Sequence, residues 1–162
     1  MKKSGRETEK TNVMRLLEQA GVEYKSYNYE GTGIISGADV AAYLGQDPDR
    51  CFKTLVTAGK SGEHYVFAVP VSGELDLKKA AAASGEKYIE MIKSKELLPL
   101  TGYVHGGCSP VGMKKQFPVF FDETAQLYET IMFSAGKIGC QVEINPEDLN
   151  KLLPVTFADI TG

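Results

Sequence analysis

The sequence predicts an α+β fold in which short helices surround a curved, barrel-like β-sheet that is mixed or mostly antiparallel. About seven β-rich runs and four or five short helical segments do not alternate regularly, which argues against a doubly wound parallel sheet. Several of the β-rich runs are separated by gaps of hairpin length. A chain of 162 residues has the length of one domain, so we expect a polar tail at 1–9 and a single domain at 10–162.

The first part of the chain predicts two helices on either side of a strand. Apolar residues recur at helical spacing over 13–20, and Thr11 is placed to cap this helix. The Tyr-rich alternation over 22–30 is typical of a strand. The sequence of 36–45 begins like a capping box and predicts a second helix, followed by a short helical turn at 47–50.

The central part predicts a hairpin followed by a helix and a strand. The β-rich runs 51–58 and 64–71 are joined by the turn 59–62, which contains two glycines. The Ala- and Lys-rich segment 75–83 is typical of a helix, and 88–92 of a strand.

The segment 93–100 predicts a short helix that Pro99 breaks. The segment 101–112 is too rich in Gly and Pro for regular structure and predicts a long loop. Three further strands are expected, then a helix that begins with Asn145 as N-cap and ends before Pro154, and finally a strand or edge segment. These four β-rich runs are 117–123, 129–135, 140–144 and 155–160.

Composition excludes several classes of protein. The net charge of −3 argues against indiscriminate binding to nucleic acid or anionic lipid. Cys51, Cys108 and Cys140 are widely spaced and odd in number, so neither a disulfide framework nor a structural zinc site is expected, and the cytoplasm is the simplest compartment. No apolar run approaches the about 18–20 residues of a membrane span, and the charged N-terminus is unlike a secretory signal.

The net charge hides an uneven distribution. Residues 76–115 carry seven lysines against four acidic residues, whereas residues 116–162 carry two lysines against seven. A local basic region allows an acidic protein to touch a polyanion at one place without coating it. The simpler interpretation, a solvated lysine-rich face, remains open.

Lys53 stands in the middle of an apolar β-rich run, where an unpaired buried ammonium would be costly. It is either a lysine on the solvent face of the strand or a cation at a cavity mouth that binds a phosphate or carboxylate. The glycine-rich loop 102–110 contains consecutive glycines, whose amides are able to form an anion-binding nest. The turn 134–139 contributes a hydroxyl and further amides, or is simply a hairpin turn.

The usual catalytic groups are scarce. His64 and His105 are the two histidines, and neither lies in a recognised hydrolase motif. A nucleophilic pair of Cys108 with His105 would require the two side chains to meet within hydrogen-bond distance, which their spacing does not establish. No metal site and no cofactor are expected.

Taken in order, several motifs resemble the YbaK/EbsC family of small trans-acting aminoacyl-tRNA deacylases, relatives of the editing domain of bacterial prolyl-tRNA synthetases. The resemblance covers residues 10–161, nearly the whole chain. Its motifs are FKTL at 52–55, ELDLKK at 74–79, TGYVHGGCSPVGMKK at 101–115, Asp122-Glu123, SAGKIG at 134–139 and ADI at 158–160.

The resemblance implies a YbaK-like fold around a pocket and assigns roles to residues of this chain. Lys53 matches the family's functional lysine at the 3′-terminal adenosine, and Gly106 to Pro110 match the G-x-x-x-P loop around the aminoacyl end. Ser134 matches a pocket hydroxyl and Tyr29 a pocket tyrosine. The catalytic set is then Lys53, Gly106, Gly107 and Ser134. The substrate-binding set is Tyr29, Phe52, Thr54, Cys108, Ser109, Pro110, Gly136 and Gln141.

Two positions depart from the family pattern. Gln141 stands where the cysteine-specific branch often has Asp, and Cys108 where an aliphatic residue is common. Both bear on which amino acid the pocket accepts.

The resemblance implies release of cysteine from Cys-tRNA(Pro), in which the thiol of the bound cysteine attacks its own carbonyl. The protein then supplies positioning and charge stabilisation, with Lys53 at the terminal nucleotide and the amides of Gly106 and Gly107 at the ester. The expected contacts to acceptor-stem phosphates are Lys78, Lys79, Lys114 and Lys115.

Three alternatives stay open: a deacylase for another small residue such as alanine, a non-catalytic module that binds an acceptor end or nucleotide, and a metabolite-binding protein. The partners expected are charged tRNA and, in a ternary complex, prolyl-tRNA synthetase. The sequence leaves the oligomeric state open.

Overall fold

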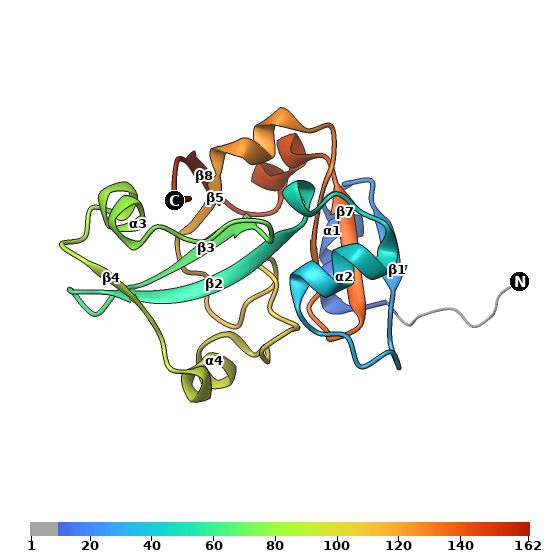
Figure 1. Ribbon diagram of the computed structural model, residues 1–162, viewed down its shortest axis with the longest axis horizontal. Coiled ribbons are helices and arrows are strands. Elements are labelled where there is room, and N and C mark those ends of the chain that lie inside the picture. The colour runs from blue at the N-terminus through green and yellow to red at the C-terminus, as the bar shows by residue number, and fades with distance from the viewer. Residues whose placement is uncertain (1–9) are drawn as a thin grey trace, which may run out of the picture.

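The computed structural model describes residues 10–162, so the tail expected at 1–9 lies outside the described residues. Two sheets lie side by side and short helices pack around them (Figure 1). The smaller sheet has the strand order β1-β7-β6, and the larger has the order β4-β2-β3-β5-β8. The strands are β1 (Lys25–Asn28), β2 (Phe52–Gly59), β3 (His64–Pro70), β4 (Ile89–Met91), β5 (Val119–Asp122), β6 (Ile131–Ser134), β7 (Cys140–Ile144) and β8 (Val155–Ala158).

The helices are short, and three of them begin at polar caps that the sequence predicts. The side chains of Thr11, Ser36 and Asn145 each accept a hydrogen bond from a backbone amide of the first turn. The α-helices are α1 (Asn12–Gln19), α2 (Gly37–Leu44), α3 (Leu77–Ser84) and α4 (Ser94–Thr101). The 3-10 helices are η1 (Pro48–Arg50), η2 (Glu123–Leu127) and η3 (Pro146–Lys151).

The α+β class and the mixed, mostly antiparallel pairing are confirmed. β2 and β3 form the expected antiparallel hairpin, and the smaller sheet is antiparallel throughout, while β3–β5 and β5–β8 are parallel. The strands do not close into one barrel. They divide into two sheets that meet at an isolated bridge between Cys51 and Met132, just before β2 begins.

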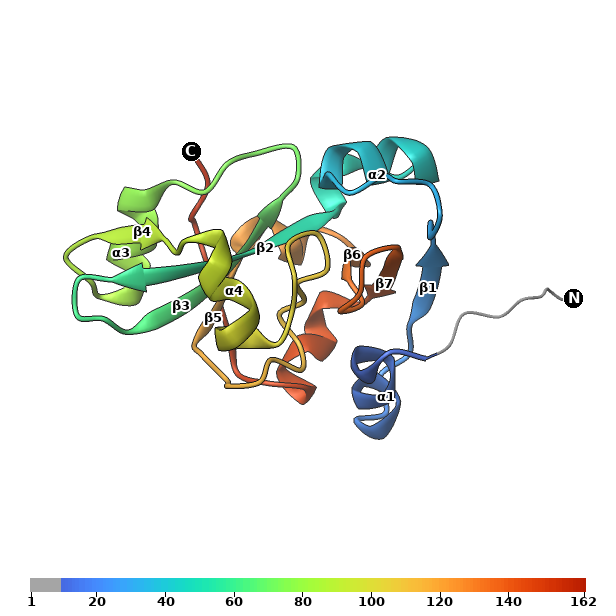
Figure 2. The ribbon, with the colours of Figure 1, turned by 90° about the horizontal axis from the view of Figure 1, so that it is seen from below.

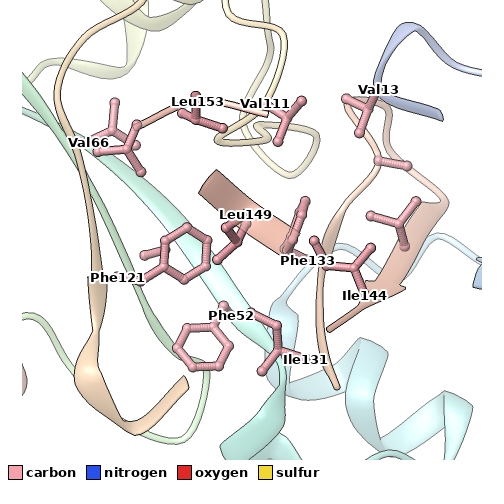
Figure 3. Close-up of a cluster of buried hydrophobic side chains, with 14 of the residues drawn as sticks. Val13, Phe52, Val66, Val111, Phe121, Ile131, Phe133, Ile144, Leu149 and Leu153 are labelled. Carbon is pink, nitrogen blue, oxygen red and sulfur yellow. The ribbon is translucent and has the colours of Figure 1, made fainter. Parts of the chain in front are cut away.

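The main apolar core fills the space between the two sheets. Phe52 from β2, Phe121 from β5 and Phe133 from β6 meet there, with ring centroids 5.7 Å apart for the first pair and 6.2 Å for the second (Figure 3). Aromatic pairs at such spacing add to the free energy gained by burying their area. This shared core holds the ends of β2 and β6 at a fixed separation, which positions the cavity described below.

Pro99 does not break the helix in which it lies. α4 continues to Thr101, and Gly102 ends it in a left-handed conformation with φ of 83°. Proline removes one amide donor, but this loss falls in the last turns of a short helix, and the Thr101 hydroxyl donates to the Leu97 carbonyl at 2.7 Å. Within residues 10–162, no helix is long and apolar enough to span a membrane.

Candidate active site

A cavity of about 480 Å³ opens where the start of β2, α2, the smaller sheet and the loop after α4 meet. The loop lies between α4 and the β6–β7 hairpin, so distant segments form one rim (Figure 2). Eight of the twelve predicted catalytic and substrate-binding residues line this cavity. They are Tyr29, Phe52, Lys53, Thr54, Gly106, Cys108, Ser134 and Gln141.

Lys53 is the second residue of β2 and lines the cavity. Its neighbour Phe52 is buried in the core, which fixes the strand, while the Lys53 side chain is 30% exposed. Its Nζ lies 3.5 Å from the carboxylate of Glu74, whose side chain is 87% exposed at the rim. An ion pair this exposed is weak, so the ammonium is able to exchange Glu74 for an anionic ligand.

The two consecutive glycines of the loop, Gly106 and Gly107, have different surroundings. Gly106 lines the cavity with φ of 88°, and a Cβ there would lie 2.5 Å from a methyl group of Ile35. Gly107 packs against the β6–β7 turn, where a Cβ would lie 2.9 Å from the amide nitrogen of Ile138. The Gly107 amide donates to the Val104 carbonyl at 2.9 Å, so it is already occupied. Within residues 10–162, the Gly106 amide has no such partner.

Ser134 and Gln141 form a cross-strand pair on β6 and β7, and both line the cavity. The Ser134 hydroxyl oxygen accepts a hydrogen bond from the Gly136 amide at 3.1 Å, which leaves its own proton free to donate. Gln141 is buried, and its Oε1 accepts a hydrogen bond from Nε2 of Gln46 at 2.7 Å. The sheet therefore presents polar donors to the cavity.

Tyr29 and Thr54 complete the polar lining. Burial raises the pKa of Tyr29, so its phenol is protonated at neutral pH. The hydroxyl oxygen of Thr54 is the one buried side-chain N or O atom in residues 10–162 that has no hydrogen-bond partner. An unpartnered polar atom in a cavity wall marks a place where a ligand atom would be bound favourably.

The cysteines of the cavity are protonated. Burial raises the pKa of Cys108 to about 12 and that of Cys51 to about 11. His105 lies at the cavity, but within the described part of the chain it forms no hydrogen bond with Cys108. A thiolate nucleophile from the protein is therefore disfavoured at this site.

The remaining predicted residues lie outside the cavity lining. Gly107, Ser109, Pro110 and Gly136 support the loop and the turn, and Ser109 is fully buried. Lys78 and Lys79 lie on α3, where Lys79 pairs with Asp159 at 3.1 Å. Lys114 and Lys115 follow the loop near α4, and the Lys115 ammonium lies 5.7 Å from the centre of the Phe117 ring. α3 and α4 lie apart in Figure 1, so the lysines on α3 and those beside the end of α4 occupy two regions.

Sequence reasoning missed Ile35, Glu74 and Gln46 as parts of this site. Ile35 lies in a loop with no recognisable motif. Glu74 opens the matched motif at 74–79, but the resemblance gave it no role in the site. Gln46 follows α2 and contacts a residue 95 positions away. The one sequence signal for Gln46 is its position as a polar residue directly after Gly45, which ends α2.

The fold is that of the aminoacyl-tRNA editing domains. A family model described as the aminoacyl-tRNA editing domain matches residues 34–152, and the chain belongs to that family. It is 49% identical to the Enterococcus faecalis protein EbsC, named as a candidate Cys-tRNA(Pro)/Cys-tRNA(Cys) deacylase, over 94% of both chains. It is also 36% identical to a proline–tRNA ligase of Pelobacter propionicus, over 52% of this chain but only 15% of the ligase.

Solved structures agree with this assignment. A candidate trans-editing enzyme for prolyl-tRNA synthetase superposes with a TM-score of 0.81 at 25% identity, covering 94% of this chain and 98% of that one. The hypothetical protein APE2540 shares the fold, with a TM-score of 0.84 at 21% identity over 93% of this chain and 99% of that one.

Proposed function

We propose that this chain is a trans-acting deacylase that releases cysteine from Cys-tRNA(Pro) in the cytoplasm. The observation that carries the proposal is the meeting of Lys53, Gly106 and Ser134 at one cavity, although they lie far apart in the sequence. Membership of the aminoacyl-tRNA editing domain family and the 49% identity to EbsC support the substrate class.

The residues of the cavity take complementary roles. Lys53 binds the phosphate of the terminal nucleotide, because its present partner Glu74 is exposed and easily replaced. The Gly106 amide and the Ser134 hydroxyl donate to the oxygen that gains charge as the ester reacts. Gly107 acts by close packing, since its amide is occupied.

The substrate supplies its own nucleophile. The sulfur of the esterified cysteine bonds to the carbonyl carbon, the bond from that carbon to the 3′-oxygen breaks, and the thiol proton ends on that oxygen. The products are a four-membered cyclic thioester and tRNA with a free 3′-hydroxyl. The protonated state of Cys51 and Cys108 supports this route, because neither offers a competing thiolate.

Charged tRNA and prolyl-tRNA synthetase are the proposed partners. A chain of net charge −3 binds tRNA weakly by itself, so a ternary complex with the synthetase would supply tRNA selectivity. Lys114 and Lys115 follow the rim loop, whereas Lys78 and Lys79 lie on α3. Phosphate contacts from all four would require the acceptor stem to pass across both regions.

The test is deacylation of Cys-tRNA(Pro) by the wild type, Lys53→Met and the control Lys60→Met. Lys60 is an exposed lysine in the β2–β3 turn, outside the cavity. We expect Lys53→Met to lose about 100-fold in kcat/KM, because a preorganised cation at the reacting end is removed, and Lys60→Met to match the wild type.

Equal rates for Lys53→Met and the wild type would contradict the assignment of this cavity. Ala-tRNA(Pro) is assayed beside Cys-tRNA(Pro): release of alanine without cysteine would replace the proposed substrate. Binding of charged tRNA without any turnover would favour a non-catalytic module.

A further inference from the structure

The amide of Gln141 is held by a chain of hydrogen bonds that begins at Cys51 and passes through Gln46. Cys51 Sγ donates to Oε1 of Gln46 at 3.3 Å, and Nε2 of Gln46 donates to Oε1 of Gln141 at 2.7 Å. Cys51 and Gln141 line the cavity, whereas Gln46 does not. Gln46 thus contacts Gln141 without itself forming part of the cavity wall.

The direction of this chain follows from its first member. A buried thiol whose pKa is raised to about 11 keeps its proton, so it serves as a donor and requires an acceptor. Oε1 of Gln46 is that acceptor, which leaves the Gln46 amide nitrogen to face Gln141. With the reverse orientation, the Gln46 nitrogen would face sulfur, which is only a weak acceptor.

Because its oxygen is occupied, Gln141 keeps both N–H groups for other partners. Within residues 10–162, Nε2 of Gln141 has no hydrogen-bond partner, and it is not enclosed as the Thr54 hydroxyl is. Among the same residues, the hydroxyl proton of its cross-strand neighbour Ser134 has no acceptor. Among the described residues that line the cavity, Glu74 alone carries a carboxylate, and it lies at the exposed rim.

We infer that Gln46 is a positioning residue that turns the amide of Gln141 so that Nε2 donates to an acceptor atom of the aminoacyl group. The contact with the aminoacyl group rests on the proposed function, whereas the orientation of the amide does not. This cavity therefore binds the aminoacyl group through its carbonyl oxygen or sulfur, and within residues 10–162 the lining offers no buried carboxylate to the α-ammonium group.

The substitution Gln46→Glu tests the orientation without a ligand. A carboxylate at position 46 accepts from both Cys51 and Gln141, so Gln141 must reverse its amide and turn Oε1 toward the cavity. Side-chain amide hydrogen exchange, measured by NMR, reads this directly. In the wild type we expect the Gln46 amide protons to exchange about ten-fold more slowly than those of Gln141, and in Gln46→Glu we expect Gln141 to become protected.

The substrate contact is tested with a stable probe, adenosine that carries cysteine through an amide at the 3′ position. We expect Gln46→Glu to bind this probe about ten-fold more weakly than the wild type, because the cavity loses a donor and gains an acceptor. Gln19→Glu, which adds the same charge on the exposed face of α1, is the matched control and should bind as the wild type does.

The outcomes separate this inference from the proposed function. Tighter binding by Gln46→Glu would show that position 141 serves the ammonium group, and fast exchange of the Gln46 amide in the wild type would refute the orientation. If the exchange rates and the probe affinities are as expected but Cys-tRNA(Pro) is not cleaved, the proposed reaction is overturned and the present inference stands. A wild type that does not bind the probe would overturn the substrate contact together with the proposed substrate, while exchange still decides the orientation.

Discussion

Two polar contacts connect the segment after α2 to strand β7, and they are built in opposite ways. Glu143 accepts hydrogen bonds from Tyr27, Thr130 and Arg50, the last at 3.3 Å. Gln141 lies two residues earlier on the same strand, and its one side-chain hydrogen bond to residues 10–162 runs through its oxygen to Gln46. Both oxygens of the carboxylate thus have donors from the protein, whereas the amide nitrogen of Gln141 has no partner within residues 10–162.

The difference distinguishes a structural group from one that is available to a ligand. A polar group whose partners all come from the fold stabilises that fold, and removing it leaves those partners unsatisfied. A group with free donors at a cavity contributes less to folding and more to binding. Substitutions at Glu143 and Gln141 should therefore affect different measurements.

The largest effect on stability is expected for Glu143→Ala. This substitution leaves the partly buried Arg50 guanidinium without its carboxylate, and removes the acceptor of Tyr27 and Thr130. We expect the free energy of unfolding in urea to fall by about 2 kcal/mol. An unchanged unfolding midpoint would show that water replaces the carboxylate at little cost.

Gln141→Ala should show the reverse pattern. We expect kcat/KM for Cys-tRNA(Pro) to fall about ten-fold, because a donor to the aminoacyl group is lost, while the free energy of unfolding changes by less than about 1 kcal/mol. Gln46 is partly exposed, so water is able to take the place of Gln141 as its acceptor. If Gln141→Ala unfolds readily but keeps full activity, Gln141 is a structural group and the contrast with Glu143 is wrong.

The smallest expected effect is the contribution of Glu143 to the pH dependence of the free energy of unfolding. Burial opposes ionisation, but hydrogen bonds from Thr130 and Tyr27 hold the pKa of Glu143 below its ordinary value. A carboxylate with a lowered folded-state pKa contributes stability above its unfolded pKa, and that contribution is lost as the pH falls through the folded pKa.

Urea unfolding of the wild type and Glu143→Gln across this acid range measures the contribution. We expect the wild type to exceed the variant in stability near neutral pH and the difference to shrink on acidification. Glutamine at position 143 has nearly the shape of glutamate and still forms hydrogen bonds. The loss in free energy of unfolding should therefore be smaller than for Glu143→Ala. A difference that is constant with pH would contradict the lowered pKa.

Much of this organisation could be predicted from residue types and their spacing. The family that the ordered motifs indicated is confirmed by the family model over 34–152. The caps at Thr11 and Ser36 and the β2–β3 hairpin follow from local rules, because each depends on neighbours within a few residues. The roles assigned to the site residues stay predictions, and the cavity brings most of them together.

Other features depended on contacts that no local pattern encodes. The division into two sheets, the persistence of α4 past Pro99 and the occupied amide of Gly107 each depend on distant or detailed packing. The family resemblance placed Gln141 in the substrate-binding set and marked it as a departure from the family pattern, but it gave no sign of which residue orients its amide. The contact between Gln46 and Gln141 could be identified only from the tertiary structure.

The sequence alone determined the α+β class, the family and the kinds of chemical group available, because periodicity, caps and ordered motifs are properties of the linear chain. Tertiary structure decided which donors remain free. Whether an amide or hydroxyl is available to a ligand depends on what else lies within about 3 Å of it, and those neighbours come from segments far apart along the chain.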